Sequence, residues 1–411
     1  MTAPLFILAC CLGLIAGAAP AIAIDSPWTR ATAPEAAAPP GAAASPLPAQ
    51  AAPERPAPAE ELTPLDSAGV GLLLNLAQTL LQRNRNARDP AAAERVRSLI
   101  GQALAAGPLN AQAWTLSAWD EMNRHRFCTA LDALGRAHRS AAPTALSLGL
   151  QADALVELGR YREALAATQQ LVDRFPGLPA FSRAAHLRWL HGDTEGAVVL
   201  LEPSLSAAPG GSEAHAWGFL QLAELELAAG RLDRAEQALR QGETLYPGKP
   251  EAAALRARLL EVRGDWRAAL RQWQDCLAGY PSPDFAVAAW RLARRIGDTM
   301  ETKRLERLLE GLARLDAEGE GLFRRSFAEY YALREPASGR AETLARRELA
   351  LRPDLYSHAL LAFALRRAGK AGEADRHARL ALRLGTADPK LRLWATGNRV
   401  DGNTEPRLAG R

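Results

Sequence analysis

The chain has 411 residues and a formal net charge of +4, with 28 basic and 30 acidic residues up to residue 300 and 22 basic and 16 acidic residues after it. This charge is too small and too little clustered for a nucleic-acid-binding protein, which needs a basic stripe with stacking aromatic residues or a known reader motif. We therefore expect no nucleic-acid partner. The length alone would allow more than one domain.

Residues 1–23 are predicted to be a signal peptide. Residues 5–18 (LFILACCLGLIAGA) form an apolar run, and Ala21-Ile22-Ala23 is a small-x-small sequence of the kind that signal peptidase cuts, here after Ala23. Two alternatives stay open, because Cys10 or Cys11 would suit a lipoprotein and the whole segment would suit an uncleaved membrane anchor. Cleavage predicts a periplasmic or secreted protein, whereas the alternatives predict a protein held close to a membrane.

Two further segments precede the regular part of the chain. Residues 24–66 are rich in alanine and proline and are predicted to be a disordered linker, because such a composition cannot bury a core. Residues 67–110 show helical apolar periodicity without the pattern described next, and are predicted to be an N-terminal cap or a degenerate repeat. Residues 389–411 are predicted to be a C-terminal tail.

A pattern of glycine, alanine and proline returns about every 34 residues, which indicates a stack of helix pairs. In each unit the glycine ends the first helix in a left-handed conformation, the alanine lets the helices approach, and the proline ends the second helix. Units are predicted to start near 111, 145, 178, 216, 250, 283, 321 and 355. The pattern is carried by Gly159, Ala164 and Pro176; Gly192, Ala197 and Pro209; Gly230, Ala235 and Pro247; and Gly264, Ala269 and Pro281.

This pattern resembles the tetratricopeptide repeat (TPR) family over residues 111–388, and the chain is also similar to secreted bacterial TPR proteins. The resemblance implies an all-α, right-handed superhelical solenoid of about eight helix-turn-helix repeats. Two units depart from the pattern. The 283 unit has Thr302 in place of the alanine, and the 321 unit has Glu335-Pro336 where the turn glycine is expected.

The resemblance further implies that positions 2, 5, 9, 12 and 13 of each first helix line a concave groove. These positions predict a partner-binding groove that is aromatic and apolar at its N-terminal end and rich in arginine at its C-terminal end. Both residue types are enriched where proteins bind one another. The predicted groove residues are Trp119, Met122, Asn123, Trp189, Trp217, Arg258, Arg291, Arg294, Arg295, Phe363, Arg366 and Arg367, together with Asp153, Glu157, His186, Leu227 and Glu261.

No catalytic signature, metal site or cofactor site is predicted. The sequence has no HExxH, GxSxG or paired CxxC motif, and His186 and His191 are five residues apart, a spacing that places them on different faces of a helix. Outside the predicted signal peptide, Cys128 and Cys276 are separated by several repeats. An intramolecular disulfide, which needs Cα atoms within about 7 Å, is therefore not expected.

The sequence therefore predicts a non-enzymatic protein-interaction scaffold, exported to the periplasm or cell surface, that binds a protein or peptide segment in its groove. Envelope assembly, secretion or polysaccharide export are the expected settings. The alternatives are a membrane-tethered co-chaperone, an accessory subunit of an enzyme complex, or a glycan-binding protein that would use Trp119 and Trp189. The partner and the oligomeric state do not follow from the sequence.

Overall fold

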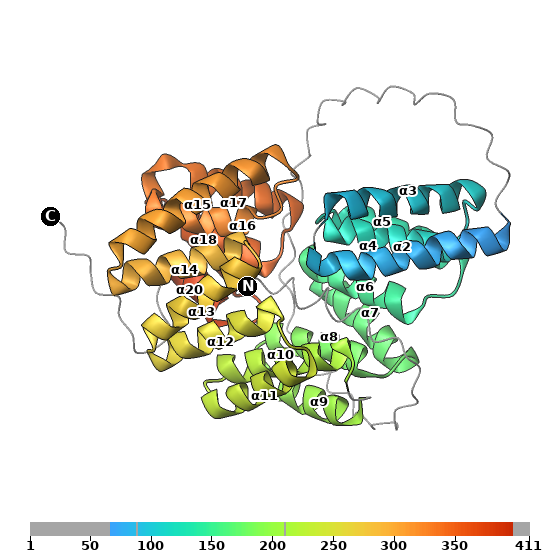
Figure 1. Ribbon diagram of the computed structural model, residues 1–411, viewed down its shortest axis with the longest axis horizontal. Helices are drawn as coiled ribbons and strands as arrows, with labels where there is room; N and C mark the ends of the chain where they lie inside the picture. The colour runs from blue at the N-terminus through green and yellow to red at the C-terminus, as the bar shows by residue number, and fades with distance from the viewer. Residues whose placement is uncertain (1–65, 88, 209–210, 398–411) are drawn as a thin grey trace.

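The computed structural model describes residues 66–87, 89–208 and 211–397. These residues form nineteen α-helices, arranged as nine antiparallel pairs and a final single helix (Figure 1). The pairs are α2 (Ser67–Ala87) with α3 (Pro90–Ala106), α4 (Ala111–Asn123) with α5 (Phe127–Ser140), α6 (Ala145–Glu157) with α7 (Tyr161–Arg174), α8 (Leu178–Leu190) with α9 (Thr194–Ala207), α10 (Glu213–Ala228) with α11 (Leu232–Leu245), α12 (Pro250–Arg263) with α13 (Trp266–Gly279), α14 (Pro283–Ile296) with α15 (Thr299–Glu318), α16 (Arg324–Arg334) with α17 (Arg340–Leu351), and α18 (Leu355–Arg367) with α19 (Ala371–Ala381), followed by α20 (Pro389–Thr396). The predicted all-α fold of stacked helix-turn-helix repeats is confirmed.

The starts of the helices follow from local sequence. The predicted repeat starts at 111, 145, 178, 250, 283 and 355 coincide with the first residues of α4, α6, α8, α12, α14 and α18. Asn110 caps α4 by accepting a hydrogen bond from the Ala113 N–H (2.9 Å), and Thr144 and Ser147 form a reciprocal capping box at α6. The other two starts are displaced by three residues, because α10 begins at Glu213 and α16 at Arg324.

The turn glycines adopt the left-handed conformation that the pattern predicts. The φ angles are +67° at Gly159, +80° at Gly192 and +76° at Gly230. Beyond each turn, the repeated alanine is buried between helices, with 0 % of its surface exposed at Ala164 and at Ala197. The glycine adopts the left-handed conformation that the turn needs, and the small alanine allows the two helices to approach closely. The sequence pattern therefore has a direct physical cause.

Two turns depart from this arrangement, one in the 321 unit and one between α4 and α5. In the turn between α16 and α17, a short 3-10 helix, η3 (Pro336–Ser338), follows Glu335, and Gly339 takes the left-handed conformation at φ +71°. In the turn between α4 and α5, the left-handed residue is His125, at φ +57°, the one non-glycine residue with a positive φ among the described residues. The 321 unit is therefore a helix pair with a longer turn.

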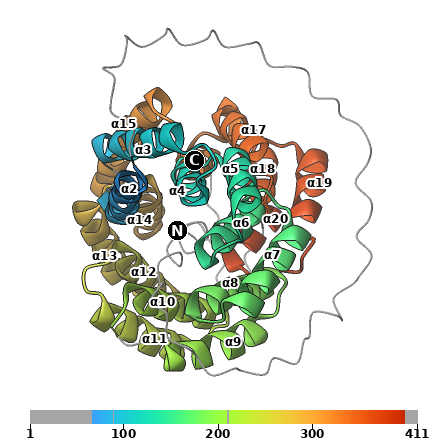
Figure 2. The ribbon, with the colours of Figure 1, turned by 90° about the vertical axis from the view of Figure 1, so that its right-hand side faces the viewer.

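The solenoid curves until its late repeats meet its early ones (Figure 2). The Leu355 N–H donates a 2.9 Å hydrogen bond to the hydroxyl of Tyr161, 194 residues earlier. One hydrophobic cluster joins Val156 and Leu190 of the early repeats with Leu361 of the late ones. We call this contact the seam and define it as residues 157–161 and 189–192 on the early side and 352–355 and 383–386 on the late side.

Both ends of the described structure extend beyond the predicted array of residues 111–388. The pair α2 and α3 packs on α4 through Leu74, Leu81 and Val96, in a cluster that also holds Trp119. At the other end, α20 continues the packed structure to Thr396, with Trp394 1 % exposed. The predicted signal peptide, the linker up to residue 65 and the tail from residue 398 lie outside the described residues.

Candidate functional site

The seam brings backbone against backbone at two turn glycines. A Cβ atom added to Gly159 would lie 2.3 Å from the carbonyl oxygen of Pro353, and one added to Gly192 would lie 2.5 Å from that of Gly385. Real Cβ atoms essentially never come this close to another heavy atom. At the same place, Arg383 donates a hydrogen bond to the Gly159 carbonyl oxygen (3.0 Å). These two glycines therefore serve both the turn of their own repeat and the approach of the late repeats.

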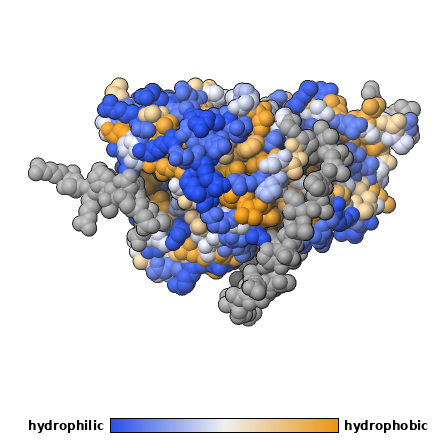
Figure 3. All heavy atoms as spheres, turned by 90° about the horizontal axis from the view of Figure 1, so that it is seen from below, coloured by the Kyte–Doolittle hydropathy of each residue, from blue (hydrophilic) through white to orange (hydrophobic). Residues whose placement is uncertain are grey.

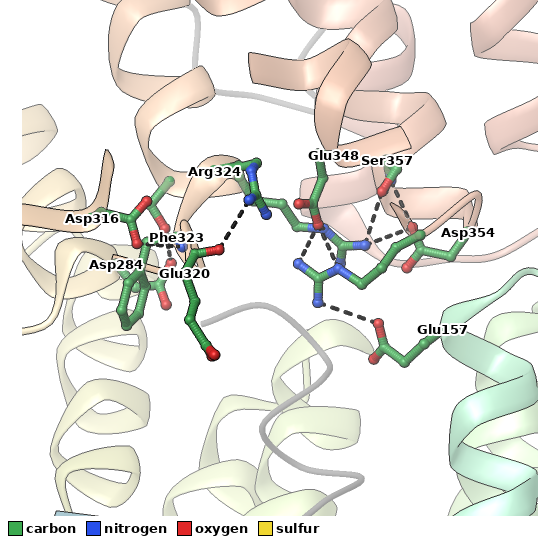
Figure 4. A network of polar contacts seen from close by, with 12 residues as sticks. Glu157, Asp284, Asp316, Glu320, Phe323, Arg324, Glu348, Asp354 and Ser357 are labelled. Atoms are coloured by element: carbon green, nitrogen blue, oxygen red, sulfur yellow. Dashed lines mark hydrogen bonds and ion pairs between the residues drawn. The ribbon is translucent and has the colours of Figure 1, made fainter. Parts of the chain in front are cut away.

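A buried ionic network crosses the seam (Figure 4). Arg325, on α16, lies 2.9 Å from Glu348 of α17 and 2.7 Å from Asp354, the N-cap residue of α18. Arg352 pairs with Glu348 and, across the seam, with Glu157 at the end of α6, at 3.3 Å. Both arginines are only 2 % exposed. Because a lone partner would be left as a buried charge, removing either side of such a pair costs about 3–5 kcal/mol.

The network has three carboxyl groups and two guanidinium groups, so full ionisation would leave a net negative charge in a buried place. Burial, only partly opposed by Arg352, raises the pKa of Glu157 to about 7. At Glu348 burial acts in the same direction, but Arg352 and Arg325 outweigh it and hold its pKa below the usual value. Glu157 is therefore the group in this network that takes up a proton near neutral pH.

The C-terminal helix is fixed on the late repeats by polar contacts as well as by Trp394. Asp388 caps α20 by accepting from the Lys390 and Leu391 N–H groups, and it accepts a 2.6 Å hydrogen bond from the hydroxyl of Tyr356 on α18. Lys390 lies 3.1 Å from Glu329 of α16. The late side of the seam, which ends at residue 386, is thus connected directly to a well-anchored helix.

The aromatic and apolar residues predicted for the groove lie in the core instead. Trp119 and Met122 are 0 % and 1 % exposed, inside the cluster of the first pairs. Trp189 and Trp217 are 4 % and 2 % exposed, inside the cluster formed around α8, α10 and α12. The groove prediction is wrong for these four side chains, because large apolar residues on first helices gain more from packing between neighbouring repeats than from facing outward.

The predicted groove arginines are less buried, and each has a partner within the chain. Arg258 lies 2.7 Å from Glu224, and Arg291 lies 3.2 Å from Glu329. The remaining contacts are Arg294 over the ring of Trp290, Arg295 over Trp266, Arg366 with Asp375, and Arg367 with the Ala332 carbonyl oxygen. Arg294 and Arg367 are exposed, whereas Asn123 and Phe363 are half-buried. These arginines belong to three helices, α12, α14 and α18.

The other first-helix positions also serve the structure. Asp153 accepts two hydrogen bonds from Arg183, at 2.9 and 2.7 Å, with both groups buried. Glu261 accepts from the indole N–H of Trp273 (2.6 Å), and Leu227 is buried. His186 is buried, and its burial lowers its pKa to about 4. Of the predicted groove set, Glu157 and Trp189 lie in the seam.

Sequence reasoning missed Tyr161, Arg325, Arg352 and Asp354. The periodic pattern places residues within a repeat and between neighbours, but it carries no signal for a contact between residues about 195 positions apart. Arg352-Pro353-Asp354, in the link before α18, is the local signal that was available, because two opposite charges flank a proline in a link that the pattern expects to be a simple connector.

The chemistry of the remaining candidate groups is limited. In residues 66–397, apart from the gaps at 88 and 209–210, no group of three or more histidine, cysteine, aspartate or glutamate side chains is arranged to hold a metal ion. Cys128 and Cys276 are both free thiols, and burial raises the pKa of the Cys276 thiol to about 12. Within the same part of the chain, no helix is both long and apolar enough to cross a membrane.

Residues 189–259 match the family model described as tetratricopeptide repeat. This part of the chain is therefore similar to the tetratricopeptide repeat family. It runs from the end of α8 through most of α12, and the TPR-like helix pairs continue on both sides of it. TPR segments are protein-interaction scaffolds and typically are not catalytic. No curated protein matches the chain.

Several solved structures are similar to this chain at low sequence identity. PilF of Pseudomonas aeruginosa is 17 % identical, with a TM-score of 0.39, and the match covers 58 % of this chain and 96 % of that one. PilW, described as a widely conserved type IV pilus biogenesis factor, is 18 % identical, with a TM-score of 0.42 and 53 % and 96 % covered. The human IFIT1 dimer with m7Gppp-AAAA is 16 % identical, with a TM-score of 0.48 and 77 % of both chains covered. At such identities and TM-scores, these likenesses say nothing about what this chain binds.

Proposed function

We propose that this protein is an exported scaffold that binds a segment of a partner protein. The observation that supports this most is the uninterrupted series of helix pairs around a matched TPR segment, since such arrays present a large, preformed surface. Export rests on the apolar residues 5–18 and the small-x-small sequence that ends at Ala23. Envelope assembly, secretion or polysaccharide export are the processes that we propose for it.

The partner is proposed to meet the exposed arginines of the late repeats. Arg294 and Arg367 are exposed, and the side chain of Arg291 is 40 % exposed. An acidic segment of a partner would compete with the internal contacts of these arginines, because guanidinium groups pair well with carboxylates. Figure 3 shows one face of the molecule, on which hydrophobic and hydrophilic residues are interspersed.

The test places a photo-crosslinking residue at position 294 and, as control, at position 240 on α11, where Arg240 is also exposed. We expect a specific adduct from position 294 only, and we expect Arg291→Glu with Arg367→Glu, but not Arg240→Glu, to abolish the adduct from that position. Equal adducts from both positions, or an adduct that survives the double reversal, would contradict the proposed binding surface. Higher salt should weaken the adduct, because exposed charges are screened.

Cell fractionation and the intact mass of the product distinguish an exported protein from a membrane-attached one. A soluble periplasmic product that starts at Ile24 supports the exported scaffold. A membrane-bound product, either complete or shortened to a lipid-modified Cys10 or Cys11, supports the tethered co-chaperone or accessory subunit instead. The glycan-binding alternative is not favoured, because Trp119 and Trp189 are buried and offer no stacking surface.

A further inference from the structure

The outer helices of the last two repeats carry an exposed basic and apolar surface. Figure 2 shows α17 and α19 on the outside of the ring, and ion pairs join them, from Arg346 to Glu373 (2.6 Å) and from Lys370 to Glu342 (2.8 Å). We call the surface the α17/α19 face. Its residues are Arg347 and Leu351 on α17, and Arg376, Arg379, Leu380 and Arg383 on or directly after α19, all of them exposed.

The positive charge of this face is not neutralised by its own carboxylates. Glu342 and Glu373 are engaged by Lys370 and Arg346, whose hydrogen bonds lower the pKa of both carboxyl groups. Asp375 is engaged by Arg366 of α18, at 2.9 Å. Within the described residues, no carboxylate pairs with Arg347, Arg376 or Arg379.

A pair of histidines shows how closely the cations of this face are gathered. His358 of α18 and His377 of α19 lie with their Nδ1 atoms 3.0 Å apart. Burial lowers the pKa of both rings. At His358, His377 and Arg383 lower the pKa further and Asp354 opposes them. At His377, Glu373 raises the pKa, whereas Arg346 and Arg376 lower it. Cations from α17, from α19 and from the turn after α19 therefore act on one place in the structure.

Apolar side chains lie among these cations. Leu351 ends α17 one turn after Arg347, and Leu380 directly follows Arg379; they are 46 % and 40 % exposed. Arginines with leucines between them suit the boundary between lipid head groups and acyl chains, where cations meet phosphates and leucines enter the apolar layer.

We propose that the α17/α19 face binds the surface of an anionic membrane. Arg347, Arg376 and Arg379 are exposed on two helices at the outside of the ring and have no carboxylate partner among the described residues, so anionic head groups can pair with them. A short acidic peptide would instead need a groove to hold it, and this face is the outside of the ring. A membrane bound here would leave Arg294, on α14, accessible to the protein partner proposed above. The membrane proposal does not depend on that partner.

The test measures co-sedimentation of the full chain with vesicles of phosphatidylcholine alone and of phosphatidylcholine with an equal amount of phosphatidylglycerol. We expect binding to the anionic vesicles to exceed binding to the neutral ones and to fall with salt. Arg376→Glu with Arg379→Glu should lower the association constant by more than about tenfold, because two attractive charges become repulsive. The matched control is Arg267→Glu with Arg271→Glu, which makes the same charge change at two exposed positions on α13.

Three other outcomes would overturn the proposal that this face binds a membrane. Equal losses in the two double variants would mean that only net charge matters, and equal binding to both kinds of vesicle would mean that the apolar N-terminal residues carry the attachment. If polyglutamate binds the wild-type protein in an Arg376- and Arg379-dependent manner while the anionic vesicles do not, the face is a site for acidic protein segments. Matching circular dichroism melting curves exclude unfolding of either variant as the cause.

Discussion

At the scale of single residues, Gly159 shows how one position serves two requirements. Its φ of +67° belongs to the turn of its own repeat, and its missing Cβ lets the Pro353 carbonyl oxygen of a distant repeat approach. Gly230 holds the same kind of turn, at φ +76°, but a Cβ there would meet no atom within 4 Å. Comparing the two positions therefore distinguishes the energetic cost of a left-handed turn from the cost of a steric clash in the seam.

We expect Gly159→Ala to cost clearly more stability than Gly230→Ala. Both variants should lose about 1–2 kcal/mol through left-handed alanine. Gly159→Ala should lose a further 1–3 kcal/mol or more, because the new Cβ overlaps backbone atoms that cannot move aside easily. Urea unfolding midpoints of the two variants measure the difference, and equal losses would show that the late repeats do not press on this turn.

Glu157 gives the seam a dependence on pH. Its folded pKa of about 7 lies above the ordinary value of 4.5, so the folded state binds the proton more tightly than the unfolded state does. The free energy of unfolding should therefore fall as pH rises from about 4.5 through about 7, and this contribution should change little outside that range. Glu157→Gln should flatten the fall, as urea midpoints across this range would show. Parallel curves for the two proteins would exclude Glu157 as the group responsible.

At the scale of helices, the sequence predicts what is local and repeated. Helix starts at 111, 145, 178, 250, 283 and 355 follow from caps, turn glycines and terminating prolines, and the structure has them at those residues. The start of α16 is displaced from 321 to 324, because α15 continues to Glu318 and a left-handed turn at Gly321 precedes Phe323, the N-cap residue of α16. The four buried groove residues were misplaced, because the same first-helix positions serve either a groove or a core, and the sequence alone does not distinguish them.

The helix α20 lies in the part of the chain where the pattern has already ended. Its side chains decide its place, because Trp394 and Leu391 are buried while Arg392 points outward. We expect Trp394→Ala to detach α20, with faster amide hydrogen exchange over residues 389–396 and a local loss of up to about 3–5 kcal/mol. Arg392→Ala on the same helix should leave exchange unchanged. Unaltered exchange in the tryptophan variant would mean that the polar contacts of Asp388 and Lys390 hold the helix alone.

At the scale of the whole molecule, the array closes on itself through the seam. An open solenoid is held together by neighbouring repeats only, whereas this chain adds contacts between Glu157 and Arg352, Tyr161 and Leu355, and Gly159 and Arg383. These contacts fix the late repeats, and with them the α17/α19 face, relative to the early ones. No repeat pattern could predict this closure, because it depends on the summed curvature of all the pairs between.

The most direct test of closure is the distance across the seam, measured by electron spin resonance between two spin labels. The labels are placed at Ala166 on α7 and Arg379 on α19, two exposed positions, in a protein that carries Cys128→Ser. We expect one narrow distance distribution at short separation in the otherwise native protein. In Arg352→Ala, which leaves Glu157 without its partner, we expect a broader distribution at longer separation. A broad or long distribution in the protein with an intact seam, unchanged by Arg352→Ala, would contradict closure.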